Sequence, residues 1–187
     1  MRPSGHLHST SIGLAFLFTL FHSFTLINGV FFLSGSLLLD GDFFVSKKFF
    51  NIANHRDFIT HSILLYVVLI IVCYIGNLDL IWLFLGSFYH LCFDLFDWGL
   101  PILPFKIITY VTPHLLTIPS NLDEIYFFKT YFSNKQILAS EIILAIGFIC
   151  SLVFLPVEMI ALIIVIELLV IIEFVFQFTR LRSVSVR

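Results

Sequence analysis

The sequence predicts an all-α fold, a polytopic helical membrane protein with about four to six membrane helices. Three observations predict this class. Of the 187 residues, 59% are hydrophobic and only 12% are charged, about half the charged share of an average soluble domain. The mean hydropathy is +1.05. The apolar residues also fall into separate runs that approach the length needed to cross a bilayer.

One integral-membrane domain is expected over residues 1–187, because no linker rich in Gly and Ser or in Pro divides the chain. It would contain a C-terminal helical pair over 137–178. Membrane lipids are the expected surroundings. The net charge of −2 gives no reason to expect nucleic acid, and the sequence leaves the question of a protein partner open.

The first apolar segment, 11–39, leaves two topologies open. A straight helix of this length would extend about 43 Å, against a hydrocarbon core of about 30 Å. Either the helix is tilted and overhangs the bilayer, or it breaks near 22–28 into a hairpin of two short helices. These alternatives place the N-terminus on opposite sides of the membrane.

Four further membrane helices are predicted over 63–75, 80–96, 137–155 and 157–178. The sequence Gly76-Asn77-Leu78-Asp79 predicts a tight turn between the first two. If the segments cross in order, the connections 40–62 and 97–136 share one side with the C-terminal tail. Nine of the 10 Lys and Arg residues fall there, so the positive-inside rule makes that side cytoplasmic, in an inner or plasma membrane. They are Lys47, Lys48, Arg56, Lys106, Lys129, Lys135, Arg180, Arg182 and Arg187.

Three polar patches reach the same side. His90, Asp94 and Asp97 follow one another at spacings of four and three residues, which places them on one helical stripe. A neutral imidazole and a carboxylate one turn apart can bind one cation; an interfacial His–Asp hydrogen bond is the alternative. In the second patch, Asp40 and Asp42 cannot share a helical face, so we expect an irregular backbone at Gly41. A solvated helix end is the alternative there.

The third patch is Asn54 to Ser62. We expect His55 on a loop and His61 at the start of a helix, which Thr60 or Ser62 would cap. Arg56 is suited to a bidentate grip on phosphate or carboxylate. Contact with a lipid headgroup or with Asp57 is the alternative for Arg56.

In this order the motifs resemble the membrane-bound metal-dependent hydrolase family, some bacterial members of which are labelled LexA-binding inner-membrane hydrolases. They are more distantly similar to zinc-dependent phospholipase C proteins. The resemblance covers roughly residues 36–105, the family-like metal-site core. Leu39 departs from the family, which has Pro there, and the spacing from His55-Arg56 to Thr60-His61-Ser62 is one residue longer. The matching motifs are Asp40-Gly41-Asp42, His55-Arg56, Thr60-His61-Ser62, Gly86 to His90 with Asp94, and Gly99 to Phe105.

The resemblance implies a divalent metal, zinc foremost, and hydrolysis of a phosphoester or lipid headgroup. For such a reaction, general acid–base chemistry assigns Asp97, or a carboxylate that binds no metal, as the proton acceptor, and Arg56 would hold the phosphate. The family's N-terminal histidine matches His6 best, then His8, with His22 a poor third. Six ligands exceed one tetrahedral zinc, so either two metals bind or some of the six only orient others. The expected metal ligands are Asp40, Asp42, His55, His61, His90 and Asp94.

Two other functions stay open. The same residues could form a structural metal clamp in a non-catalytic protein, or the 97–136 connection could bind a partner. Alternatively, Glu167, Glu173 and the His and Asp residues of the three patches could form an ion or proton pathway. Glu167 lies deep in its apolar segment, where a carboxylate is costly. It would relay protons, contact another helix, or stay protonated and hydrogen-bonded.

Overall fold

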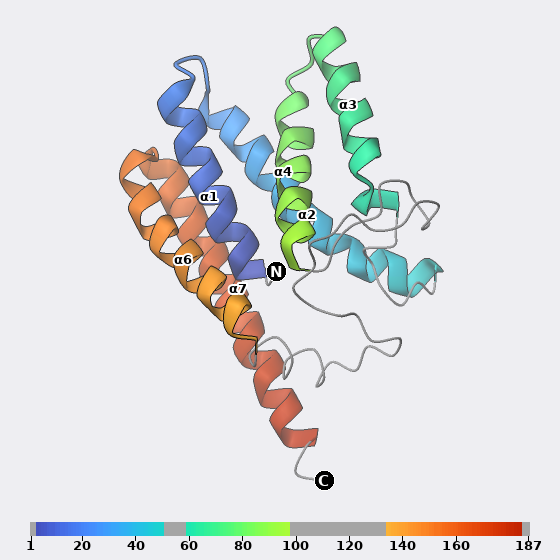
Figure 1. Ribbon diagram of the computed structural model, residues 1–187, viewed down its shortest axis with the longest axis vertical. Helices are drawn as coiled ribbons and strands as arrows, with labels where there is room; N and C mark the ends of the chain where they lie inside the picture. The colour runs from blue at the N-terminus through green and yellow to red at the C-terminus, as the bar shows by residue number, and fades with distance from the viewer. Residues whose placement is uncertain (1–2, 51–58, 98–133, 185–187) are drawn as a thin grey trace.

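The computed structural model of the chain describes residues 3–50, 59–97 and 134–184 (Figure 1). These residues form helices and contain no strand, which confirms the all-α prediction for them. The α-helices are α1 Pro3–Leu20, α2 Leu26–Phe50, α3 Ile63–Ile75, α4 Ile81–Asp97, α6 Lys135–Ser151 and α7 Val157–Val184. Two 3₁₀ helices, η2 Ile59–His61 and η4 Leu152–Phe154, precede α3 and follow α6.

The first apolar segment is a hairpin of two helices, the second of the two predicted topologies. Helix α1 already begins at Pro3, a residue well suited to a first helical turn, and it extends for about 27 Å. The break ends at Thr25, whose hydroxyl oxygen accepts a hydrogen bond of 3.3 Å from the backbone N–H of Asn28. Both ends of the hairpin therefore lie away from this turn, and residue 3 lies at the same end of the bundle as the later part of α2 (Figure 1).

Helix α2 corrects one prediction. It continues without a break through Asp40, Gly41 and Asp42 and ends only at Phe50. The expected irregular backbone at Gly41 was wrong, because a single glycine lowers helix stability by only about 1 kcal/mol and the residues on both sides continue the helix. Two residues that are two positions apart in a helix lie on different faces. The backbone therefore gives no support for both carboxylates binding one metal.

Helices α2 and α4 approach each other closely at two glycines. A Cβ atom on Gly35 would overlap the carbonyl oxygen of Leu83, and one on Gly86 would overlap the carbonyl oxygen of Phe32. The hydroxyl of Ser87 donates a hydrogen bond of 2.9 Å to the Gly35 carbonyl at the same crossing. Small residues of this kind let helix backbones come into contact. Gly86 lies one turn before His90, so the crossing sets where His90 is held.

Short turns, as predicted, join α3 to α4 and α6 to α7. Helix α3 begins and ends where the sequence predicts, and Asn77 has a positive φ of 50° in the tight turn before α4. Ser62 occupies the N-cap position of α3 without a side-chain capping bond, and His61 ends η2 rather than beginning α3. Helix α6 begins two residues earlier than predicted, because the side chain of Asn134 accepts hydrogen bonds from the first turn.

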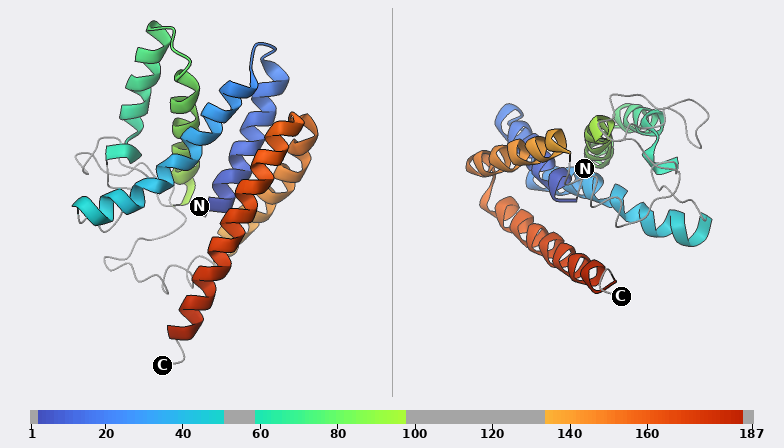
Figure 2. Two further views of the ribbon diagram at one scale, coloured as in Figure 1. Left: turned by 180° about the vertical axis from the view of Figure 1, so that it is seen from behind. Right: turned by 60° about the horizontal axis from the view of Figure 1, so that its bottom comes forward.

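Helix α1 lies between the α2–α4 pair and the α6–α7 pair (Figures 1 and 2). Its apolar side chains share one core with α2 and α7, which includes Leu7, Leu33, Met159 and Ile163. A smaller cluster of Leu39, Tyr66 and Leu91 joins α2, α3 and α4. The three short turns point toward one end of the bundle, whereas the start of α1 and the end of α4 meet at the other (Figure 1).

Among the described residues, one helical stretch is long and apolar enough to cross a membrane by length and composition, Lys135–Phe154. Three shorter apolar helical stretches accompany it, Leu26–Leu39, Ile63–Ile75 and Ile81–Leu95. The helices themselves are thus confirmed for the described residues. That about four to six of them cross a membrane stays a prediction.

Candidate metal centre

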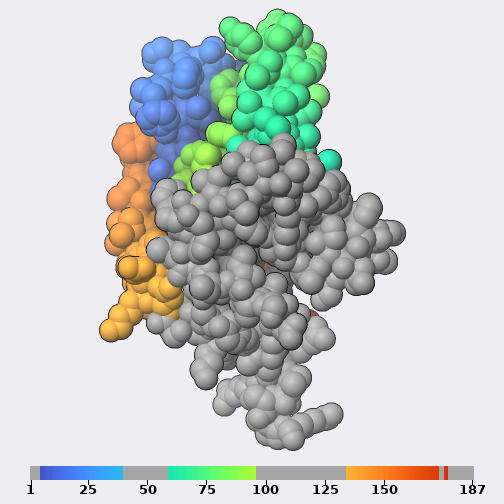
Figure 3. Space-filling view, turned by 45° about the vertical axis from the view of Figure 1, so that its right-hand side comes forward, coloured from blue at the N-terminus to red at the C-terminus, as the bar shows by residue number. Residues whose placement is uncertain are grey.

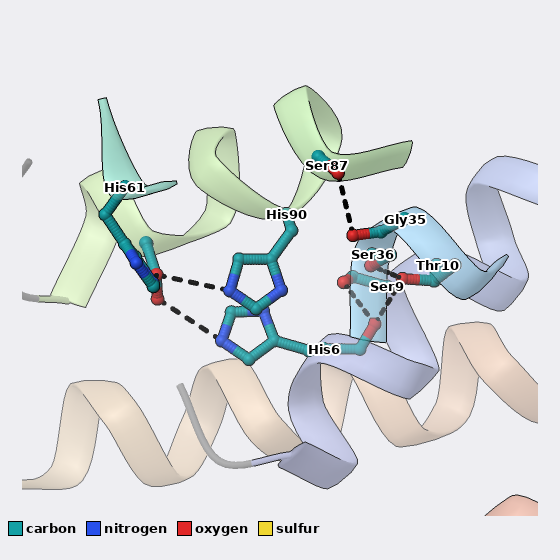
Figure 4. A network of polar contacts seen from close by, with 9 residues as sticks. His6, Ser9, Thr10, Gly35, Ser36, His61, Ser87 and His90 are labelled. Atoms are coloured by element: carbon teal, nitrogen blue, oxygen red, sulfur yellow. Dashed lines mark hydrogen bonds and ion pairs between the residues drawn. The ribbon is translucent and has the colours of Figure 1, made fainter. Parts of the chain in front are cut away.

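Three histidines converge on one aspartate at the end of the bundle where α1 begins. His6 comes from the first turns of α1, His61 from the end of η2, and His90 and Asp94 from the last turns of α4. The Nε2 atoms of His6 and His90 lie 3.2 Å from Oδ1 and 3.3 Å from Oδ2 of Asp94, respectively. The Nε2 atom of His61 lies 3.8 Å from Oδ2. Figure 4 shows the three imidazole rings gathered on one side of α4.

The rings are arranged around the carboxylate in two ways. His6 stacks on His90, with ring centroids 3.8 Å apart and ring planes 14° apart. His61 meets His90 edge to face at 6.1 Å. One ligand atom each from His6, His90 and Asp94 lies within 4.8 Å of the others. The site therefore offers imidazole nitrogen and carboxylate oxygen, a donor set that zinc prefers.

Two of the contacts have the spacing of ligands around a small divalent cation, although they go to different oxygens of Asp94. Nitrogen and oxygen ligands lie about 2.0–2.2 Å from zinc, so two ligands of a tetrahedral site are about 3.3 Å apart. The His6–Asp94 and His90–Asp94 contacts of 3.2 and 3.3 Å are close to that value. The His61 contact of 3.8 Å is longer. His6, His90 and Asp94 are thus the best-placed ligands, and His61 lies next to them.

The electrostatics of the site also favour a cation. All four side chains are fully buried. If the imidazoles are neutral, the carboxylate of Asp94 leaves a buried negative charge, which is costly without compensation. The charge is compensated if one imidazole is protonated or a cation binds, and it is absent if Asp94 is protonated. The Nδ1 atom of His6 makes no hydrogen bond to any described residue, and its Nε2 atom faces Asp94.

A chain of hydroxyl groups holds the His6 turn against α2. The hydroxyl of Thr10 donates a hydrogen bond of 2.6 Å to the His6 carbonyl and also contacts the hydroxyl of Ser36 (Figure 4). A hydroxyl carries one hydrogen, so Thr10 must accept from Ser36. On the other face of this region, the Tyr89 hydroxyl donates to the Ser9 carbonyl at 2.9 Å. Both α2 and α4 therefore fix α1 close to the candidate ligands.

The structure brings some of the predicted ligands together, and others lie outside the described residues. The structure brings His61, His90 and Asp94 together, and adds His6, which the sequence could not place because the hairpin was one of two options. Asp40 and Asp42 lie in α2, and Asp97 is the last residue of α4. The side chains of these three carboxylates are outside the described residues, as are His55 and Arg56 altogether. The roles assigned to these five residues stay predictions.

Two other N-terminal histidines lie away from the centre. His8 is on a different side of α1, where its Nε2 atom lies 3.3 Å from Oε1 of Glu167. His22 is exposed in the turn between α1 and α2. Glu167 thus contacts another helix, which was one of its three predicted roles. The side chain of Glu173 lies outside the described residues, and the ion or proton pathway stays a prediction.

The signal that could have identified His6 is the length of the apolar segment 11–39. It is too long for one plain crossing, and only the hairpin returns the first residues to the level of His90. No protein-family model, curated protein or solved structure matches this chain. The resemblance to membrane-bound hydrolases therefore depends on the ordered motifs alone.

Proposed function

We propose that this protein is a membrane-embedded, metal-dependent hydrolase that acts on a phosphoester, such as a phospholipid headgroup. The observation that carries the proposal is the convergence of three histidine side chains on Asp94 in a fully buried cluster. A bound cation would compensate the buried charge of this carboxylate. The ordered resemblance to membrane-bound hydrolases supplies the reaction class.

The distribution of polar and apolar residues supports a membrane setting. Inside the bundle, three histidines, Asp94 and seven hydroxyl residues are buried, whereas much of the outside is apolar. Soluble proteins rarely expose large contiguous apolar patches. Figure 3 shows α3 at the surface, on the same face as the α1–α2 hairpin. On α3, α6 and α7 the exposed apolar residues include Val68, Ile71, Val72, Ile75, Ile142, Ile143, Ile146, Ile149, Leu168, Leu169, Ile172 and Val175.

The hairpin strengthens the case for a cytoplasmic site. Helix α1 begins at the end of the bundle where α4 ends and α6 begins (Figure 1). Arg2 directly precedes α1 in the sequence, so in this topology all 10 Lys and Arg residues would belong to the same side, rather than nine. By the positive-inside rule this end faces the cytoplasm. The metal centre then lies near the cytoplasmic interface of an inner or plasma membrane, close to lipid headgroups.

The chain's own residues have distinct proposed roles. His6, His90 and Asp94 would hold the cation, with His61 as a further ligand or as the residue next to the reacting group. A divalent cation, zinc foremost, supplies the Lewis acidity that lets water act as a nucleophile near neutral pH. Arg56 would hold the phosphate, and Asp97 or a carboxylate that binds no metal would accept a proton.

Hydrolysis by the purified full-length chain tests the proposal. The zinc-loaded protein would be reconstituted in vesicles of phosphatidylglycerol and phosphatidylethanolamine, and released phosphate-containing headgroups would be measured. We expect turnover that falls by more than about 100-fold in Asp94→Asn and His90→Ala, since even groups that only support a metal ligand change activity by 10- to 100-fold. His22→Ala is the matched control and should keep full activity. Equal turnover in Asp94→Asn and the unaltered protein would overturn the proposal.

One observation favours a second candidate, a structural metal clamp. All four side chains of the centre are fully buried, and closed sites with four protein ligands are typical of structural zinc. In that case zinc would bind and stabilise the fold, but no headgroup would be released from any vesicle. The hydrolase proposal requires both zinc binding and turnover, so the same protein sample separates the two.

A further inference from the structure

A second polar contact lies on the side of α1 that faces the C-terminal helices. The Nε2 atom of His8 is 3.3 Å from Oε1 of Glu167 in α7, and the two side chains are only 13% and 19% exposed. His8 is two residues from His6. In a helix this spacing turns the two side chains to different faces. The first turns of α1 therefore carry one histidine toward α4 and one toward α7.

Helix α6 contributes to the surroundings of this contact. The ring of His8 stacks on Phe148 of α6, with centroids 4.8 Å apart and ring planes 20° apart. The carboxylate of Glu141, also on α6, lies against Gly5 of α1, where a Cβ would be 2.8 Å from one of its oxygens. The Nδ1 atom of His8 and Oε2 of Glu167 make no hydrogen bond to any described residue. Within the described residues, the Nε2–Oε1 pair is therefore the polar contact that joins these two side chains, whereas apolar packing has no preferred direction.

Rotation of α1 links this contact to the metal centre. Residues 6 and 8 belong to the same rigid helical turn, so a rotation that separates His8 from Glu167 also moves His6 relative to Asp94. Apolar packing against α7, through Met159 and Ile163, tolerates small rotations because it has no preferred direction. A nitrogen–oxygen contact of 3.3 Å tolerates much less.

We propose that the His8–Glu167 contact is a positioning device that sets the rotation of α1 and so places His6 at the metal centre. This inference rests on the proposed function, since it requires that His6 binds a metal. Neither His8 nor Glu167 touches the cation. The C-terminal helical pair then has a defined purpose, which is to orient one ligand of a centre built from the first half of the chain.

Binding of Co²⁺ to the full-length protein in detergent micelles tests the inference, because the absorption spectrum of bound Co²⁺ reports the arrangement of its ligands. Glu167→Ala should weaken Co²⁺ affinity about 2- to 30-fold, the range for substitutions that couple to a site through packed neighbours, and should shift the spectrum. Glu167→Gln should restore both, because its amide oxygen can still accept from His8. The exposed Glu158 on the same helix supplies the matched control, Glu158→Ala, which should leave both unchanged.

If Glu167→Ala fails to fold, as circular dichroism would show, His8→Phe replaces it. Phenylalanine keeps the stack on Phe148 and removes both ring nitrogens, and His22→Phe is its control. Co²⁺ that binds the unaltered chain and both substituted chains with the same affinity and spectrum would overturn this inference while leaving the metal centre in place. An unaltered chain that binds no Co²⁺ would overturn the metal centre itself, and this inference with it.

Discussion

The imidazole rings of His6 and His90 stack face to face, with centroids 3.8 Å apart. Two imidazolium cations at this separation would repel each other strongly in a buried site. At least one ring is therefore neutral, with a nitrogen lone pair available to a metal. Because both rings contact the same carboxylate of Asp94, the stack places two nitrogen donors beside two oxygen donors. This relationship joins the first helix of the chain to the fourth.

Zinc should stabilise the folded protein. A ligand that binds only the folded state at about 100 times its dissociation constant adds about 2.7 kcal/mol to the free energy of unfolding. We expect thermal unfolding in detergent, followed by circular dichroism, to shift upward when zinc is added to chelator-treated protein. Mg²⁺, which avoids nitrogen ligands, is the control cation. An identical unfolding temperature with zinc, with Mg²⁺ and with chelator would contradict the prediction.

The close crossing of α2 and α4 should not tolerate a methyl group. Gly35→Ala and Gly86→Ala each place a Cβ against a backbone carbonyl, of Leu83 and Phe32 respectively. Overpacking of this kind lowers stability by about 1–3 kcal/mol. Gly147→Ala is the control, because there the nearest atom is the end of the flexible Ile12 side chain. Reversible unfolding in mixed micelles would measure the three effects, and equal losses at all three glycines would argue against the crossing.

The hydrogen-bond chain from Ser36 through Thr10 to the His6 carbonyl should contribute to stability. Ser36→Ala removes the donor to Thr10 within a fully buried pair. We expect a loss of about 1 kcal/mol, which is typical of a buried hydrogen bond. The nearby Ser34 is half-buried and makes no such bond, so Ser34→Ala should leave stability nearly unchanged. The same unfolding assay compares the two, and equal stability of both variants would refute the role of this chain.

The hairpin makes a prediction about sidedness. If α1 and α2 both cross the membrane, the two chain ends lie on one side and the α3–α4 turn on the other. After replacement of Cys73, Cys92 and Cys150 by alanine, single cysteines introduced by Ser4→Cys and Ser185→Cys should react with an impermeant maleimide from the cytoplasmic side. Asp79→Cys should react only from the opposite side. Labelling of the residue 4 and residue 185 cysteines from opposite sides would rule out the proposed topology.

Much of the fold could be predicted from the sequence. Helix α3 begins and ends as predicted because a continuous apolar run stops at Gly76 and starts after a polar patch. The boundary at Asp40 was wrong for the converse reason: polar residues suggested a connection, although the backbone there continues as a helix. A polar composition indicates contact with water, but it does not show that a helix has ended. Helix α2 continues through its polar residues.

Part of the centre could be predicted as well. His90 and Asp94 share one helix, so their spacing alone predicts their contact. The choice of His6 over His8 could not be made, because it depends on how α1 is rotated between α4 and α7. That rotation arises from packing between helices that are distant in the sequence. Local patterns contain no information about it.

The metal content of the purified protein tests the central claim most directly. The full-length chain would be purified in detergent, incubated with a small excess of zinc, desalted and analysed by mass spectrometry for bound metal. We expect about one zinc per chain, since three or four ligands complete one tetrahedral site, and loss of that zinc in a combined His90→Ala and Asp94→Ala variant. His22→Ala should retain it. An unaltered chain without zinc, or a double variant with full zinc content, would contradict the assignment of this cluster as a metal centre.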